Sequence, residues 1–113
     1  MATKADNNKT AAASTNATSV TAVPTQIDSI DLTNYAGYSC FFKIYDNATT
    51  PTVGTDIPIL TIPVPTLSES THAWPDGLQL ANGYTYAMTK LIADTDTTVL
   101  VAGDMKAHSD YIS

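Results

Sequence analysis

The sequence predicts an all-β fold, a single antiparallel β-sandwich of about seven short strands with an extended N-terminal arm. The chain is rich in threonine and tyrosine, which suit the pleated, half-buried surface of a strand. Short apolar segments alternate with turn-forming proline, glycine and asparagine, and no stretch has the spacing of an amphipathic helix. With 113 residues, the chain fits one domain.

Two apolar segments form the predicted centre of the sandwich. Residues 41–45 and 57–64 are rich in aromatic and β-branched side chains and are expected to be strands. The polar segment between them, with Pro51 and Gly54, is expected to be a long displayed loop. Lys43 and Thr61 interrupt the two strands, so one face of each is expected to point to water.

The segments on either side of this centre carry strand and turn signals. Residues 20–32 alternate but contain Pro24, which predicts two short strands or one kinked edge strand, and residues 34–38 are expected to turn. Pro63 and Pro65 are expected to end the second central strand, because proline has no N–H to donate. Residues 66–72 are polar and could form an exposed strand.

Two turns and two more strands are predicted in the last third of the chain. Residues 74–77, Trp-Pro-Asp-Gly, have the composition of a β-turn, and Asn82-Gly83 that of a tight turn with positive φ angles. Residues 84–92 give the clearest strand, and residues 105–112 are expected to be the last one, with Lys106, His108 and Asp110 on one face. Between them, residues 99–102 are expected to form a short strand or a turn of helix.

The leading segment differs in composition from the rest. Residues 1–19 consist mostly of alanine, threonine, asparagine, serine and lysine, with almost no large apolar side chain, and residues 20–113 are assigned to the sandwich. Such a segment buries too little surface to offset the entropy of ordering it. We therefore expect residues 1–19 to be an arm laid along a neighbouring subunit or partner. The alternative is that it packs back on its own domain.

Charge and cysteine content exclude several classes of function. The net charge is −6, arginine is absent and the five lysines are scattered, so neither nucleic acid nor an anionic membrane surface is an expected partner. No apolar stretch is long enough to span a bilayer, and no signal peptide is recognised at the N-terminus. Cys40 is the single cysteine and is expected to be a small buried side chain, consistent with folding in a reducing cytoplasm.

No arrangement of residues predicts an enzyme or a cofactor. His72 and His108 are far apart in the sequence and lack neighbouring ligands, so both are expected to be solvated strand residues. Asp94 and Asp96 resemble the start of a calcium loop, but the glycine and glutamate that complete such a loop are missing. A solvated loop is therefore expected, with Asp56 and Asp104 as further ligands only if the fold brings them close.

From Phe42 onward, about the last two thirds of the chain, the sequence resembles a family of small structural proteins of tailed bacteriophages. The matching segments are residues 43–58 (Lys-Ile-Tyr-Asp-Asn-Ala-Thr-Thr-Pro-Thr-Val-Gly-Thr-Asp-Ile-Pro), 60–65 (Leu-Thr-Ile-Pro-Val-Pro), 83–89 (Gly-Tyr-Thr-Tyr-Ala-Met-Thr) and 93–98 (Ala-Asp-Thr-Asp-Thr-Thr). The resemblance implies a β-sandwich virion component, made in the host bacterial cytoplasm, that decorates or cements a capsid.

This resemblance suggests partners and contact residues. The expected partners are the major capsid protein or other virion subunits, with a homo-oligomer as the assembled state. The arm is expected to supply partner-binding residues, and Tyr35 and Tyr38 are candidates for surface recognition; the arm residues are Lys4, Asn7, Asn8, Lys9 and Thr10. The alternatives are a tail or collar component, or a carbohydrate- or receptor-binding sandwich in which Trp74, Tyr35 or Tyr38 stacks on a sugar.

Overall fold

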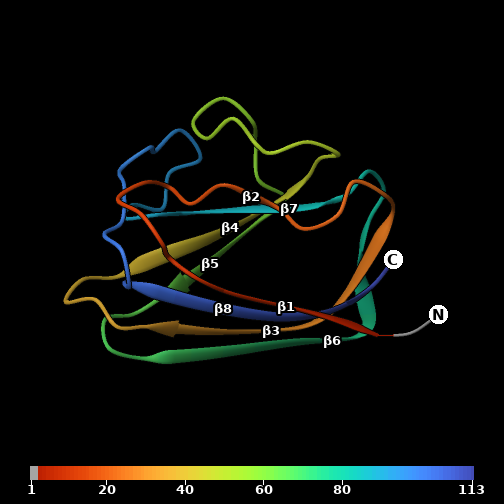
Figure 1. Ribbon diagram of the computed structural model, residues 1–113, viewed down its shortest axis with the longest axis horizontal. Helices are drawn as coiled ribbons and strands as arrows, with labels where there is room; N and C mark the ends of the chain where they lie inside the picture. The colour runs from red at the N-terminus through yellow and green to blue at the C-terminus, as the bar shows by residue number, and fades with distance from the viewer. Residues whose placement is uncertain (1–2) are drawn as a thin grey trace.

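Alternation of apolar and polar side chains along the strands produces two stacked sheets (Figure 1). The computed structural model describes residues 3–113 and is all-β over that range, which confirms the predicted antiparallel sandwich. It has eight strands: β1 (Lys4–Lys9), β2 (Thr18–Ser19), β3 (Thr25–Asn34), β4 (Cys40–Asp46), β5 (Leu60–Val64), β6 (Glu69–Leu80), β7 (Tyr84–Thr89) and β8 (Met105–Ile112). Sheet A has the order β1-β8-β3-β6 and sheet B the order β2-β7-β4-β5. No helix able to cross a membrane occurs among residues 3–113.

The hydrophobic core lies between the inner faces of the two sheets. Strand β8 shows how the sequence builds it, because Met105 and Ala107 are buried while Lys106 is exposed and His108 half-exposed, as predicted. Sheet B contributes larger side chains, and Phe42 packs against Tyr86 with ring centroids 4.8 Å apart. Cys40 is a free, buried thiol within this core, as expected.

The outer faces of the two sheets differ in their contact with water. The outer face of sheet A is polar, but that of sheet B is covered by the connections 47–59 and 90–104, which lie above it in Figure 1. All six residues of β7 are consequently buried, including Thr85 and Thr89 on the outer face. The prediction that Lys43 points to water is wrong, because this side chain lies under the same cover and is 0% exposed.

Residues 74–77 were predicted to be a turn between strands, and this is wrong, because strand β6 continues through them. Ile27 of β3 pairs with Leu78, and Ser29 pairs with Ala73, so residues 74–77 stand opposite the single residue Asp28. The four residues bulge out of the edge strand, and Gly77 takes a φ of 79° that favours glycine. The turn composition is therefore accommodated as a wide bulge.

The predicted tight turn at Asn82-Gly83 is also wrong. Strands β6 and β7 belong to different sheets, so this segment is a corner between layers, and neither residue has a positive φ angle. Asp46 supports the corner, since its carboxylate accepts hydrogen bonds from the backbone N–H groups of Ala81 and Asn82 at 3.1 and 2.8 Å. Glycine is needed at 83 because a Cβ there would lie 2.5 Å from the Asn47 carbonyl oxygen.

Other boundaries differ from the sequence predictions at the strand ends. Strand β5 begins at Leu60, and it continues through Pro63, which is tolerated because β5 is an edge strand and its outer side needs no N–H donor. Residues 90–92 lie beyond the end of β7, and residues 99–102 form neither strand nor helix. These apolar residues belong to the connections that cover sheet B.

The leading segment is built into both sheets of its own chain. Residues 4–9 form β1, which pairs antiparallel with β8, and residues 18–19 form β2, which pairs with β7. This is the alternative in which the segment packs on its own domain. A polar segment can be held in this way because backbone hydrogen bonds to a strand edge do not depend on apolar side chains.

Candidate interaction surfaces

The two connections over sheet B form a single surface layer, here called the loop cap (residues 47–59 and 90–104). The two loops touch at Gly54, where a Cβ would lie 2.7 Å from the Thr97 side chain and 3.3 Å from the Thr95 carbonyl oxygen. Gly54 has a φ of 90°, so its backbone conformation also favours glycine. The loop cap is thus a packed structural layer rather than two independent loops.

Lys43 attaches the loop cap to the sheet below it. Its Nζ donates a hydrogen bond to the carbonyl oxygen of Ala93 at 2.6 Å. Burial lowers the pKa of Lys43, and the nearby carboxylates of Asp96 and Asp94 oppose this shift. The buried ammonium group therefore has one direct hydrogen-bond partner and two carboxylates that compensate its charge.

The aspartates of the loop cap stabilise loop conformation. The Asp96 carboxylate accepts hydrogen bonds from the Thr98 hydroxyl at 2.6 Å and the Leu91 N–H at 3.1 Å. Burial alone would raise the pKa of Asp96, but these hydrogen bonds and Lys43 outweigh it and hold the pKa below its ordinary value. Asp56 similarly accepts from the Thr52 N–H at 2.7 Å.

Asp94 and Asp96 do not form a recognisable metal site. Among residues 3–113, no group of three or more histidine, cysteine, aspartate or glutamate side chains is arranged to hold a metal ion. Asp96 instead orders residues 91–98 of its own loop. The His108 Nε2 lies 3.3 Å from the Asp110 carboxylate on the outer face of sheet A.

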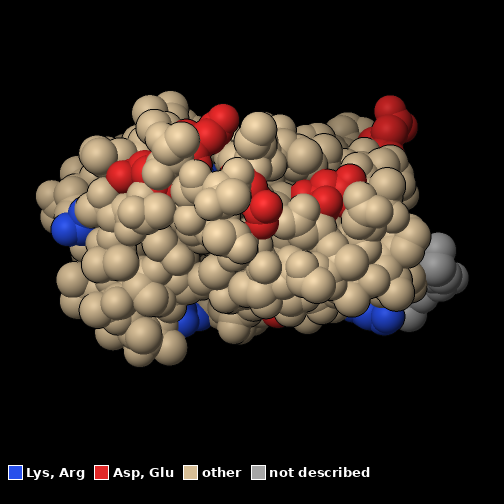
Figure 2. All heavy atoms as spheres, turned by 90° about the horizontal axis from the view of Figure 1, so that it is seen from above, with Lys and Arg blue, Asp and Glu red and all other residues tan. Residues whose placement is uncertain are grey.

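The loop cap displays large apolar side chains to water. Ile57 is 76% exposed, and five others are at least 46% exposed: Ile59, Leu91, Ile92, Val99 and Val101. Figure 2, which looks down on this side of the molecule, shows acidic groups gathered over it and lysines near its margins. None of these residues was predicted from the sequence to be a contact residue. Apolar side chains inside segments rich in aspartate, threonine and proline are the signal that could have identified them.

Strand β1 places the five predicted arm residues in different environments. Asn7 and Lys9 pair with His108 and Lys106, so they share the outer face of sheet A. Asn8 is half-buried and donates a hydrogen bond to Asp6 at 2.8 Å, while Lys4 donates to the Ser113 hydroxyl at 2.9 Å.

Thr10 lies just beyond β1 and is only 4% exposed. Its N–H donates to the Met105 carbonyl oxygen at 2.9 Å, and its carbonyl oxygen accepts from the Gly103 N–H at 2.8 Å. Its hydroxyl is also close to the Val101 carbonyl oxygen, at 3.3 Å. Thr10 therefore joins the start of the chain to the end of the loop cap and has almost no surface to offer a partner.

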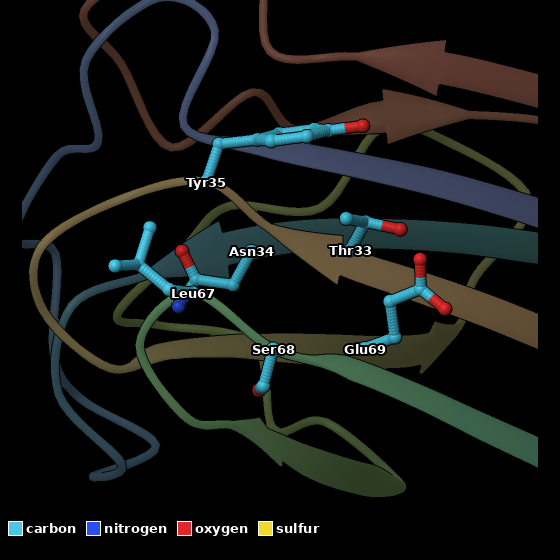
Figure 3. Close-up of a pocket in the computed structure, with 6 residues that line it drawn as sticks. All are labelled: Thr33, Asn34, Tyr35, Leu67, Ser68 and Glu69. Atoms are coloured by element: carbon cyan, nitrogen blue, oxygen red, sulfur yellow. The ribbon is translucent and has the colours of Figure 1, made fainter.

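Tyr35 and Tyr38 differ in how much of each ring is free. Tyr35 is 52% exposed and lines a pocket of about 220 Å³ with Thr33, Asn34, Leu67, Ser68 and Glu69 (Figure 3). The Lys9 Nζ lies 5.1 Å from the centre of its ring. Leu67, on the other side of the pocket, is 74% exposed and has a φ of 50°, an uncommon conformation for leucine.

Tyr38 is engaged within the chain through both its ring face and its hydroxyl group. The Lys90 Nζ lies 4.1 Å from the ring centre, and the Tyr38 hydroxyl donates a hydrogen bond to the Asp104 carboxylate. Burial and this carboxylate raise the pKa of Tyr38 to about 12. Of the two tyrosines, Tyr35 is therefore the one whose ring can meet a ligand or partner.

The histidines and Trp74 form no catalytic arrangement in the described range. His72 forms a 2.7 Å hydrogen bond with Ser70 and stacks on Trp74, with ring centroids 6.4 Å apart. Trp74 is partly buried and packs against the core. His108 lies on the opposite, outer face of sheet A, so the two histidines do not converge.

Comparisons with known proteins give remote structural likenesses only. No protein-family model matches the chain, and no curated protein sequence matches it. One crystal structure of the Tobacco streak virus coat protein is 14% identical with a TM-score of 0.42, covering 95% of this chain and 85% of that one. A structure of the dimer of the same coat protein is 13% identical with a TM-score of 0.39, covering 98% and 86%. Both likenesses are too remote to carry an argument about what this chain does.

Proposed function

We propose that the chain is a non-enzymatic structural protein of a bacteriophage virion, a decoration or cement protein that binds the major capsid protein and stabilises the shell. The observation that carries this proposal is the exposure of six large apolar side chains on the loop cap. Exposed apolar side chains concentrated on one surface are typical of protein–protein contact sites.

The resemblance to phage structural proteins involves the same surface. Two of its matching segments, residues 43–58 and 93–98, supply much of the loop cap and the lysine that anchors it. A rigid cap is suited to binding a capsid, because contact residues fixed in advance lose little conformational entropy on association. The acidic groups on this side of the molecule favour a partner surface that carries lysine or arginine (Figure 2).

The exposed residues of β1 supply a second contact region in this proposal. Lys4, Asn7 and Lys9 are exposed along one outer edge of sheet A. A decoration protein with contacts on two sides links neighbouring subunits, and binding through both sides is stronger than binding through either one. A homo-oligomer placed on the symmetric capsid lattice would repeat this pair of contacts.

The test is to determine whether the protein occurs in virions and where it lies. Virions purified from the source of the chain are analysed by mass spectrometry and cryo-electron microscopy. We expect sandwich-shaped density on the outer surface of the shell, with the loop cap against the capsid protein. Absence of the protein from virions would overturn the proposal, and density at the collar or tail would replace it with the alternative of a tail or collar component.

Substitutions then test the loop cap itself. Ile57→Asp and Leu91→Asp place a charge among the exposed apolar side chains and are expected to lower occupancy on particles several-fold. Val23→Asp is the matched control, because Val23 is 51% exposed but precedes β3, outside the loop cap. Equal occupancy for all three variants would exclude the loop cap as the binding surface.

Carbohydrate or receptor binding is a second candidate function, favoured by the pocket beside Tyr35. An exposed tyrosine ring next to the Glu69 carboxylate and the Thr33 hydroxyl offers stacking and hydrogen bonding to a sugar (Figure 3). Specific glycan binding on an array that is lost in Tyr35→Ala would support this function. Retention in Tyr38→Ala is the expected control, since Tyr38 is engaged within the chain.

A further inference from the structure

Strand β1 is attached to the molecule through its backbone rather than through a hydrophobic core. It is the outermost strand of sheet A and pairs with β8 along its whole length, from Lys4 opposite Tyr111 to Lys9 opposite Lys106. None of its residues belongs to the core cluster of buried apolar side chains. Its removal would therefore cost the hydrogen bonds of one ladder but little buried apolar surface.

The inward-facing side chains of β1 are polar and are poorly suited to their position. Asp6 and Asn8 stand opposite Ser109 and Ala107, on the side of sheet A that faces Tyr84 and Tyr86. Burial raises the pKa of Asp6, although Asn8 and His108 partly offset this effect. At neutral pH a carboxylate is thus held in a position that disfavours its charge, which weakens the docking of β1.

A short exposed segment connects β1 to the rest of the chain. Thr10 is fixed against Met105, but Ala11, Ala12 and Ala13 are all exposed and form a bend closed by a hydrogen bond from the Ser14 N–H to the Ala12 carbonyl oxygen. From Ser14 onward the chain is fixed again, because the Ser14 and Thr15 carbonyl oxygens accept hydrogen bonds from loop-cap residue Leu100 and from Met88 of β7. The Asn16 side chain also accepts a hydrogen bond from the Ala11 N–H at 3.2 Å and donates one to the Ala12 carbonyl oxygen at 3.3 Å. Opening residues 11–13 as a hinge breaks these exposed hydrogen bonds but leaves those of Thr10, and of the Ser14 and Thr15 carbonyl oxygens, in place.

We propose that β1 is exchanged between two copies of this chain, so that β1 and Thr10 of one copy pair with β8 and Met105 of the other. The exchanged state makes the same ladder and the same Thr10 hydrogen bonds as the closed monomer, because donor and acceptor segments are identical in both copies. The two states differ in the conformation of residues 11–13, in the hydrogen bonds that close this bend, and in the new contact between copies. Extended, three residues reach about 10 Å, which connects two sandwiches placed side by side.

The exchange specifies the contact through which the homo-oligomer of the proposed function would form. In that respect it rests on the proposed function. It needs no capsid protein, so the two can fail separately. A chain that exchanges β1 but is absent from virions would refute the decoration function alone. A chain that is present on capsids with β1 closed would refute the exchange alone.

Single-cysteine variants test the exchange directly. Asn7 and His108 are register partners on the outer face of sheet A, and directly opposite residues in antiparallel strands are close enough for a disulfide. One chain carrying Asn7→Cys and a second carrying His108→Cys are mixed in denaturant, refolded together at high concentration and oxidised. An isotope label on one chain identifies the heterodimer by mass, and the buried Cys40 is kept in both.

We expect a disulfide-linked heterodimer between the two variants, since exchange brings the cysteines of different chains together. The matched control is a mixture of Asp31→Cys and His108→Cys, because Asp31 is the partner of His108 on β3, which is not exchanged. Several-fold more heterodimer than in the control supports the proposal. An equal yield overturns it. A chain carrying both Asn7→Cys and His108→Cys is the positive control, because closure of its internal disulfide shows that the β1–β8 ladder is intact in the variants.

Discussion

The Nζ of Lys43 lies 2.6 Å from the carbonyl oxygen of Ala93. This hydrogen bond joins β4, in the middle of sheet B, to the loop that follows the neighbouring strand β7. The contact closes 50 residues of chain and lies under a surface layer rather than at the surface. It explains why a lysine occurs in a strand buried on both faces. The ammonium group is the connector between the sheet and the loop cap.

Replacing Lys43 should loosen the loop cap before it affects the core. Lys43→Met keeps the length of the side chain but removes the donor, so we expect faster amide exchange across residues 90–98 and a loss of about 1 kcal/mol in unfolding free energy. Lys43→Ala also removes buried methylene groups and should cost about 2–5 kcal/mol. Lys106→Met, on the exposed face of β8, is the control. Unchanged exchange in Lys43→Met would contradict the role given to this hydrogen bond.

Gly83 should not tolerate even a methyl group. An added Cβ would lie 2.5 Å from the Asn47 carbonyl oxygen and 2.6 Å from the Thr21 carbonyl oxygen, and both are backbone atoms that cannot rotate away. We expect Gly83→Ala to lower the unfolding free energy by about 1–3 kcal/mol, measured by urea denaturation. Gly37→Ala is the matched control, since nothing lies within 4 Å of the Cβ position there. Similar midpoints for the two variants would refute the steric argument.

Asp6 should make stability depend on pH. Because the pKa of Asp6 is raised in the folded chain, the folded state binds more protons than the unfolded state between pH 3.8 and the folded-state pKa. The contribution of Asp6 to the free energy of unfolding therefore falls as pH rises through that window, and it stays lower at neutral pH. Asp6→Asn is expected to melt at a higher temperature than the parent at pH 7, with the difference shrinking below pH 3.8.

Asp76→Asn provides the control for this pH effect, because Asp76 is exposed on the bulge of β6. Its melting temperature should follow that of the parent across the same range. A gap between Asp6→Asn and the parent that stays constant with pH would show that the effect is not due to ionisation of Asp6.

Tyr45 and Tyr84 should respond in opposite directions to loss of their hydroxyl groups. The Tyr45 hydroxyl is the one buried side-chain polar atom within residues 3–113 that has no hydrogen-bond partner, whereas the Tyr84 hydroxyl donates to Ser109 at 3.0 Å. An unpaired buried hydroxyl costs about 1–3 kcal/mol, so Tyr45→Phe should raise the unfolding free energy by about 1 kcal/mol. Tyr84→Phe should lower it by about 1 kcal/mol. Destabilisation by both variants would mean that Tyr45 has an unrecognised partner.

Burial could be predicted from the sequence for strands in which apolar side chains face the core and polar side chains face water in alternation. In β8, the polar face of Lys106 and His108 and the apolar face of Met105 and Ala107 were both identified correctly, because no segment of residues 3–113 buries Lys106 on the outer face of sheet A. Lys43 was wrongly assigned to a solvent-facing position, because the loop cap covers the outer face of sheet B. A period-two pattern reports which residues share a face, but it does not reveal that a distant loop covers that face.

The turn signals were recognised, but their place in the fold depends on partners far away in the sequence. Residues 74–77 have turn composition, yet the ladder between β3 and β6 resumes on both sides of them, so they form a bulge. The Asn82-Gly83 pair occurs at a corner between sheets, where close approach of the Asn47 and Thr21 carbonyl oxygens is what requires glycine. Local propensity therefore located these features without determining their geometry.

The bulge at residues 74–77 also limits how the molecule can polymerise. Strand β6 is the far edge of sheet A, and an incoming straight strand would lose register where four residues stand in place of one. On sheet B, the edge strand β5 carries Pro63, which lacks the N–H that strand addition requires. Addition of further strands is therefore hindered at both of these edges, which opposes growth of the sheets into fibrils.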